Sequence, residues 1–86
     1  MPELSRFYGI IIRMFYGDHP PPHFHAVYQG EEIKLNINNL EVIEGRMSRR
    51  AQALVFEWAA LHRVELRQAW ELASRNQEPS KIPPLE

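Results

Sequence analysis

The chain contains no cysteine, which excludes a disulfide framework and any metal site built on thiolates. It also lacks an apolar run near the roughly 20 residues that a membrane-spanning helix requires. The first residues, MPELSRFYG, have neither the basic nor the apolar region of a signal peptide. These absences predict a cytoplasmic protein that makes no use of a membrane.

A strong charge of one sign is missing as well. Lys and Arg number 10 against 11 Asp and Glu, a formal net charge of −1 with histidine neutral. Domains that coat nucleic acid carry an extended basic surface, so contact with RNA would have to come from a local cluster of cations. A length of 86 residues indicates one domain.

The first half of the chain has the patterns of β-strands. Residues 6–16, RFYGIIIRMFY, are apolar on both faces, which predicts one strand covered on each side. HFHAVYQG predicts a second strand that ends in a glycine turn, and EEIKLNIN predicts a third with Ile33, Leu35 and Ile37 inward. The next two asparagines predict a turn into a short fourth strand, LEVIEG.

The second half has the pattern of helices. Residues 48–75 contain no Gly or Pro, their apolar positions recur at helical spacing, and Ser48 is a suitable N-cap. Either one long helix or two shorter helices broken near His62-Arg63 fits this segment, and its length favours the break. His62 then forms a hydrogen bond at the junction, and Trp58 and Trp70 are packing anchors.

Together these elements predict an α+β domain over residues 1–78. A small antiparallel sheet of three to four strands is followed by one long or two shorter C-terminal helices packed on one face. Residues 79–86, rich in proline, predict an extended tail rather than a packed element.

Three of the four histidines lie in GDHPPPHFHAVY, residues 17–28. The three X-Pro junctions predict a polyproline II segment rising about 3.1 Å per residue, which separates His19 from His23 by roughly 12 Å. That distance is too long for two ligands of one ion, unless a cis proline folds the segment back. His19 is therefore expected to be a turn residue, together with Asp18.

His23 and His25 are a closer pair, because residues two apart in a strand share a face. If Phe24, Ala26 and Tyr28 point into the core, both histidines lie on the open face of the sheet. The neighbouring strands then contribute the polar side chains of Arg13, Lys34 and Asn36.

Three interpretations of this pair remain open. The histidines are solvated polar residues, or they are the catalytic acid–base groups of an anion or RNA site in which Arg13 and Lys34 bind the substrate. The third is a divalent metal held by His23, His25 and an unidentified carboxylate. The first two require no cofactor.

A second basic cluster, Arg46, Arg49 and Arg50, lies at the start of the helical region. Cations at a helix N-terminus oppose the helix dipole, so stability does not explain their position. They are either a solvated edge or a binding site for a carboxylate or phosphate.

Several motifs, in order over essentially the whole chain, resemble a family of short bacterial proteins known only as a domain of unknown function. They are SRFYGI, DHPPPHFHA, an EG turn before a helix, and EWAALHRVEL followed by a tryptophan. The resemblance implies the bacterial cytosol and a partner, a second small protein encoded nearby. The pair would be similar to a type II toxin–antitoxin module, with this chain as the toxin-like member. No catalytic residue carries over.

The leading hypothesis is a toxin-like protein that acts on RNA or ribosome-bound message, as a ribonuclease that uses His23 and His25. The alternative is a non-catalytic interaction or regulatory module that docks another protein through the histidine face or the arginine cluster. The third hypothesis is a small metal-binding protein. Whether the chain is an enzyme, and whether it forms a homodimer, is left open.

Overall fold

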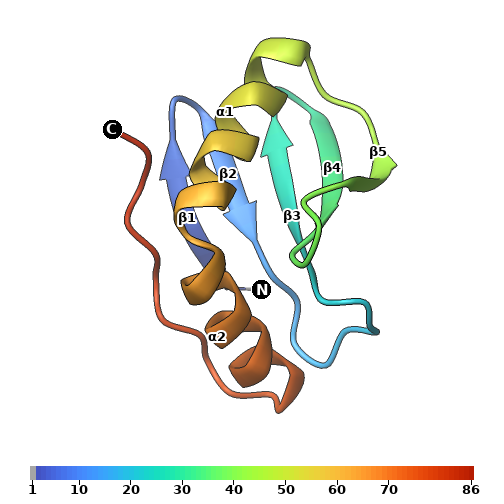
Figure 1. The fold of residues 1–86 in the computed structure, drawn as a ribbon, viewed down its shortest axis with the longest axis vertical. Coiled ribbons are helices and arrows are strands. Elements are labelled where there is room, and N and C mark those ends of the chain that lie inside the picture. Colours follow the sequence, from blue (N-terminus) through green and yellow to red (C-terminus); the bar gives the residue numbers. More distant parts are fainter. Residues whose placement is uncertain (1) are drawn as a thin grey trace.

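The computed structural model describes residues 2–86, which form a five-stranded antiparallel sheet followed by two helices (Figure 1). The strands lie in the sheet in sequence order: β1 (Glu3–Phe7), β2 (Ile10–Arg13), β3 (His23–Tyr28), β4 (Glu31–Asn36) and β5 (Val42–Gly45). The helices are α1 (Arg49–Leu61) and α2 (Arg63–Ser74). The α+β class is confirmed, whereas the predicted three to four strands are too few.

The additional strand comes from residues 6–16, which do not form one strand. The chain reverses at Tyr8 and Gly9, whose φ angles are 49° and 81°, and Phe7 pairs with Ile10 across the turn. Positive φ at both central residues is the geometry of a tight two-residue hairpin. The reversal returns Phe7 to the buried face that carries Ile10 and Ile12. The segment therefore has apolar residues at both odd and even positions because it contributes to two strands, and each strand directs apolar side chains into the core.

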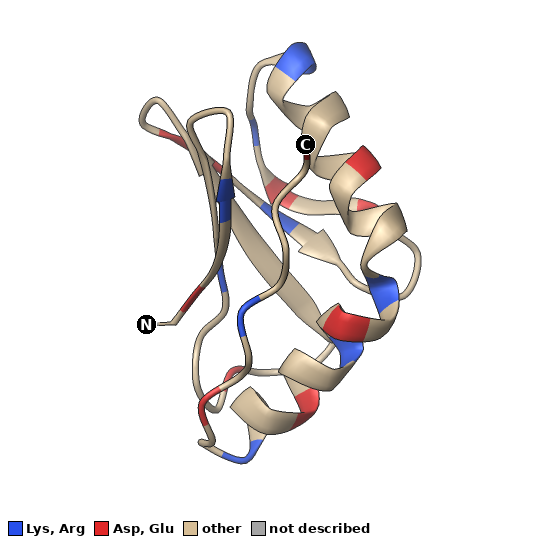
Figure 2. Ribbon diagram, turned by 90° about the vertical axis from the view of Figure 1, so that its left-hand side faces the viewer, with Lys and Arg blue, Asp and Glu red and all other residues tan. Residues whose placement is uncertain are grey.

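The core lies between one face of the sheet and the helices, which Figure 2 shows on a single side. Trp58 of α1 is fully buried and packs on Phe7 and Phe24, with ring centroids 5.4 and 5.9 Å away. The inward positions predicted for β4 and the residue after it are also confirmed, since Ile33, Leu35 and Ile37 are at most 1% exposed.

The helical region is divided as its length suggested. Ser48 caps α1, its Oγ accepting from the Ala51 backbone N–H at 3.3 Å. The helix ends at Leu61, and α2 begins after His62, whose Nδ1 lies 2.9 Å from Glu65 Oε2. This is the hydrogen-bonded junction predicted for His62. Neither helix of residues 2–86 combines the length and apolarity needed to cross a membrane.

Residues 79–86 have no regular secondary structure, but they do pack on the domain. The Ile82 backbone N–H donates to the Leu4 carbonyl oxygen at 2.8 Å, and Trp58 Nε1 donates to the Pro83 carbonyl oxygen at 2.8 Å. Pro79 and Ile82 are buried. The tail thus covers the β1 side of the core, and the expectation of an unpacked arm is wrong. Edge strands are commonly protected in this way.

Candidate functional site

The loop of residues 14–22, between β2 and β3, positions the candidate site. The Gly17 backbone N–H donates to the Ala73 carbonyl oxygen at the end of α2 (2.9 Å), and the Pro22 carbonyl accepts from Ile37 N–H (2.9 Å). Gly17 has φ 59°, a conformation that L side chains rarely adopt. The Pro20–Pro21 peptide is cis, so the continuous polyproline II segment predicted here is wrong.

Three side chains meet at this loop: Asp18, His23 and His25. Each offers one ligand atom, and these atoms lie within 4.8 Å of one another. His23 Nε2 is 2.8 Å from Asp18 Oδ2, and His25 Nε2 is 3.9 Å from the same oxygen. Asp18 is therefore part of the cluster, and its predicted role as a mere turn residue is wrong. His19 is exposed and outside it.

His23 is buried, with 3% of its surface exposed. Its Nδ1 lies 2.7 Å from the Pro21 carbonyl oxygen. Because a carbonyl oxygen only accepts, Nδ1 carries the proton and donates it. The Trp70 ring of α2 covers the imidazole at 5.1 Å. The ring is thus fixed with Nε2 toward Asp18, and the open, solvated position predicted for His23 is wrong.

In His25, as in His23, one ring nitrogen donates a hydrogen bond and the other lies toward Asp18. Nδ1 lies 2.9 Å from Glu32 Oε2 and donates to it, while Nε2 is buried and has no hydrogen-bond partner among residues 2–86. The Phe15 ring packs against the imidazole, centroid to centroid at 4.5 Å. Burial lowers the pKa of His25 despite the opposing effect of the hydrogen bond that His25 donates to Glu32. Neutral His25 therefore keeps a free lone pair on Nε2, directed toward Asp18 and His23.

Asp18 supplies the negative charge of the cluster. Burial alone would raise its pKa, but hydrogen bonds from the His19 backbone N–H and the His23 ring hold the pKa below its usual value. Oδ1 accepts from the His19 N–H at 2.8 Å. Oδ2 faces both histidines, so the cluster holds a carboxylate at neutral pH.

Two cations flank His25 in the sheet. On the face opposite the core, His25 pairs with Arg13 of β2 on one side and with Lys34 of β4 on the other. Asn36 pairs with His23. These are the neighbours predicted from strand alternation, and the structure brings all of them together. Lys34 Nζ lies 3.5 Å from Glu44 Oε1.

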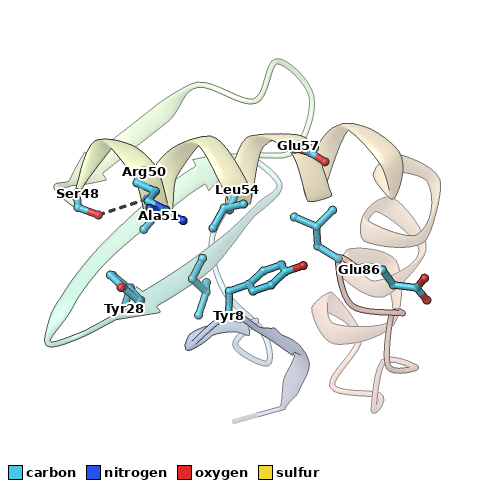
Figure 3. A pocket seen from close by; sticks show the side chains of 10 residues that line it. Tyr8, Tyr28, Ser48, Arg50, Ala51, Leu54, Glu57 and Glu86 are labelled. Atoms are coloured by element: carbon cyan, nitrogen blue, oxygen red, sulfur yellow. Dashed lines mark hydrogen bonds between the residues drawn. The ribbon is translucent and has the colours of Figure 1, made fainter.

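Arg49 and Arg50 do not join this cluster. Both are exposed in the first turn of α1, and Arg50 lines a separate groove of about 540 Å³ against the two hairpin turns. Figure 3 shows Arg50 on the helix above Tyr8 and Tyr28. This groove shares no residue with the histidine cluster.

Two acidic residues of the site, Asp18 in the cluster and Glu32 beside it, were missed as site residues in the sequence. Asp18 lies five positions before His23, in the same motif, and its proximity depends on how the proline loop folds. Strand alternation, with Ile33, Leu35 and Ile37 inward, indicates that Glu32 lies on the outward face. Its contact with His25 additionally requires the β3–β4 register, in which Glu32 pairs with Val27.

The comparisons with known proteins identify a family without assigning a function. A family model described as "Domain of unknown function (DUF4160)" matches residues 9–71, so the chain belongs to that family. The resemblance to such a family is confirmed. No curated protein matches the chain, and no solved structure does.

Proposed function

We propose that this DUF4160 protein is a metal-binding protein whose Asp18, His23 and His25 hold one divalent transition-metal ion, with Zn²⁺ as the reference ion. The carrying observation is that both histidines turn Nε2 toward Asp18 while their Nδ1 atoms are occupied. Two imidazoles and a carboxylate form a common donor set for catalytic zinc.

The distances fit such an ion after small shifts. Bonds of about 2.0–2.1 Å in a tetrahedral arrangement place neighbouring ligand atoms about 3.3 Å apart. The observed distances of Asp18 Oδ2 to the two Nε2 atoms, 2.8 and 3.9 Å, bracket this value. Side-chain adjustments of less than about 1 Å bring these two pairs to ideal separation.

The hydrogen bonds around the cluster support metal binding more directly than the distances. Ligating histidines usually donate their other ring N–H to a carbonyl or a carboxylate, which fixes the tautomer and the ring orientation. Here the Pro21 carbonyl oxygen accepts from His23 Nδ1 and the Glu32 carboxylate accepts from His25 Nδ1. Both Nε2 atoms are thereby left on the side of Asp18, where an ion would replace the proton between His23 Nε2 and Asp18 Oδ2.

Metal binding also accounts for two electrostatic features of the cluster. His25 Nε2 is a buried acceptor without a partner among the described residues, and such groups are costly when left unsatisfied. His23 Nε2 and Asp18 Oδ2 are both natural acceptors 2.8 Å apart, so a proton or a cation must lie between them. A divalent ion satisfies all three atoms.

The test is metal stoichiometry on protein purified without a polyhistidine tag. We expect one Zn²⁺ per chain by elemental analysis and by calorimetric titration. The variants Asp18→Asn and His25→Ala should lose binding, whereas His19→Ala, an exposed histidine next to the cluster, should retain it. Absence of bound metal after zinc supplementation would overturn the proposal.

We retain a second proposal, that the protein is a toxin-like member of a two-protein module that acts on RNA. The observation that favours it is the pair of cations beside His25, since Arg13 and Lys34 are suited to a phosphate. Basic residues are otherwise mixed with acidic ones along the chain, as Figure 2 shows, and His23 is buried. An RNA substrate would therefore have to be recognised locally.

Growth after induced expression tests this second proposal. We expect growth to slow with the native chain and to recover when the neighbouring small protein is co-expressed or when His23 and His25 are replaced by Ala. His19→Ala serves as the control. Unchanged growth together with intact cellular RNA would overturn the toxin role. Stable co-purification of the neighbouring protein with unchanged growth would instead favour the non-catalytic interaction module.

A further inference from the structure

The row Arg13–His25–Lys34 crosses three strands on the face of the sheet that the helices leave uncovered. Directly paired residues in antiparallel strands have Cβ atoms about 4.5–5.5 Å apart. Both cations are therefore immediate neighbours of one ligand of the proposed metal ion. We infer that the metal centre binds the phosphate group of a ligand at a further coordination position, with Arg13 and Lys34 holding its remaining oxygens.

This inference rests on the proposed metal site. The cluster provides three ligand atoms, whereas Zn²⁺ takes at least four, and a site with three protein ligands leaves a position for water or a substrate. Asp18 is about a quarter exposed through its side chain. Solvent therefore reaches the cluster from this side, and the vacant coordination position can be filled from outside.

A hollow of about 290 Å³ lies beside His25, lined by Glu32, Ile33, Lys34, Glu44 and Gly45. Lys34 is thereby accessible in the hollow and is 29% exposed through its side chain. Asp18, His23 and Arg13 do not line this hollow, and its two carboxylates, Glu32 and Glu44, disfavour an anion. The hollow therefore makes Lys34 accessible without being the position of the phosphate itself.

The carboxylates near the row Arg13–His25–Lys34 contact other groups and leave Arg13 without an ion pair among residues 2–86. Glu32 accepts from His25, and Glu44 lies 3.5 Å from Lys34. On β1, Glu3 pairs with Arg13 in register but forms its ion pair with Arg6 at 2.8 Å. No ion pair of Arg13 is found within residues 2–86. Arg13 is half-buried as a residue, and an arginine without an ion pair is well suited to bidentate contact with a phosphate.

Calorimetric titration of inorganic phosphate into the zinc-loaded and the zinc-free protein tests this inference. We expect phosphate to bind the zinc-loaded chain one to one and the zinc-free chain at least roughly tenfold more weakly. Arg13→Gln should weaken phosphate binding by roughly tenfold, the loss of one charge-assisted contact. Arg67→Gln, on the exposed surface of α2, should leave it unchanged.

Zinc affinity is measured on the same samples, because it distinguishes a loss of phosphate binding from a loss of folding or of zinc binding. If the zinc affinity of Arg13→Gln equals that of the native chain, the variant is folded and the effect belongs to phosphate. Zinc binding without phosphate binding, or phosphate binding that ignores zinc or Arg13, would overturn the inference and leave the metal proposal intact. Failure to bind zinc would overturn both.

A competition experiment identifies the source of the phosphate. A short single-stranded oligoribonucleotide is titrated against bound inorganic phosphate on the zinc-loaded protein. Displacement at the same site, sensitive to Arg13→Gln, supports a phosphodiester of RNA as the ligand. Retention of inorganic phosphate alone supports a free phosphate or a small phosphate ester.

Discussion

His23 Nε2 lies 2.8 Å from Asp18 Oδ2, and the two residues are joined by a loop with three consecutive prolines. The opposite nitrogen of His23 donates to the Pro21 carbonyl of the same loop. One short segment therefore supplies the carboxylate, the first imidazole and the group that orients it. His25 adds the second imidazole from the adjacent position on the same face of β3.

The proposed metal site predicts competition between protons and metal. Zn²⁺ requires an unprotonated Nε2 on His25, whose pKa burial lowers from the ordinary 6.5, so zinc affinity should fall as the pH drops from about 6.5 through that lowered pKa. Calorimetric titrations at several pH values, in two buffers of different ionisation enthalpy, measure the affinity and the protons released. A pH-independent affinity over this range would contradict histidine ligation.

Glu32 is predicted to act as a positioning residue for metal binding through His25. Replacing Glu32 by Gln weakens the orientation of the His25 ring, and loss of such a partner typically costs 10–100-fold in metal affinity. Glu31→Gln, the exposed neighbour in β4, is the matched control. Zinc affinity is measured by competition with a chelator. Equal affinities for the two variants would show that Glu32 does not position His25 for metal binding.

The metal-free protein should lose stability in mildly acidic solution because of His25. Burial lowers its pKa from the ordinary value of 6.5, so the unfolded chain binds the proton more readily than the folded one. Stability contributed by neutral His25 is complete above about pH 6.5 and is lost as the pH falls from there through the lowered folded-state pKa.

Urea unfolding at several pH values, with a chelator present, measures this effect. His25→Gln should flatten the dependence in that window, and His19→Ala should preserve it. Asp18 also has a lowered pKa, but its contribution disappears as the pH falls below its ordinary value of 3.8 toward the folded-state pKa. The two groups are therefore resolved by their pH ranges.

The packed tail predicts a large effect of a substitution near the end of the chain. Ile82 is 4% exposed, and truncating a buried isoleucine to alanine costs about 2–5 kcal/mol. Ile82→Ala should therefore lower the free energy of unfolding by about that amount, as measured by urea denaturation. Lys81→Ala, one position earlier and exposed, should change it by less than about 0.5 kcal/mol.

Local patterns in the sequence were sufficient for much of the fold. Ser48 was recognised as an N-cap because its oxygen accepts from a residue three positions away, an interaction set by the chain itself. The alternation of Ile33, Leu35 and Ile37 likewise identified the buried face. The Tyr8–Gly9 hairpin was missed because tyrosine occupies a turn position where asparagine or aspartate is the usual signal.

The sequence by itself determined the α+β class, the division of the helices at His62 and the placement of His23, His25, Arg13 and Lys34 on one face of the sheet. These depend on periodicities of two and of about 3.6 residues, which are local. Only the tertiary structure decided that Asp18 joins the histidines, that Trp70 covers His23 and that Glu32 orients His25. These contacts depend on the path of the proline loop, the docking of α2 and the strand register, which no local pattern specifies.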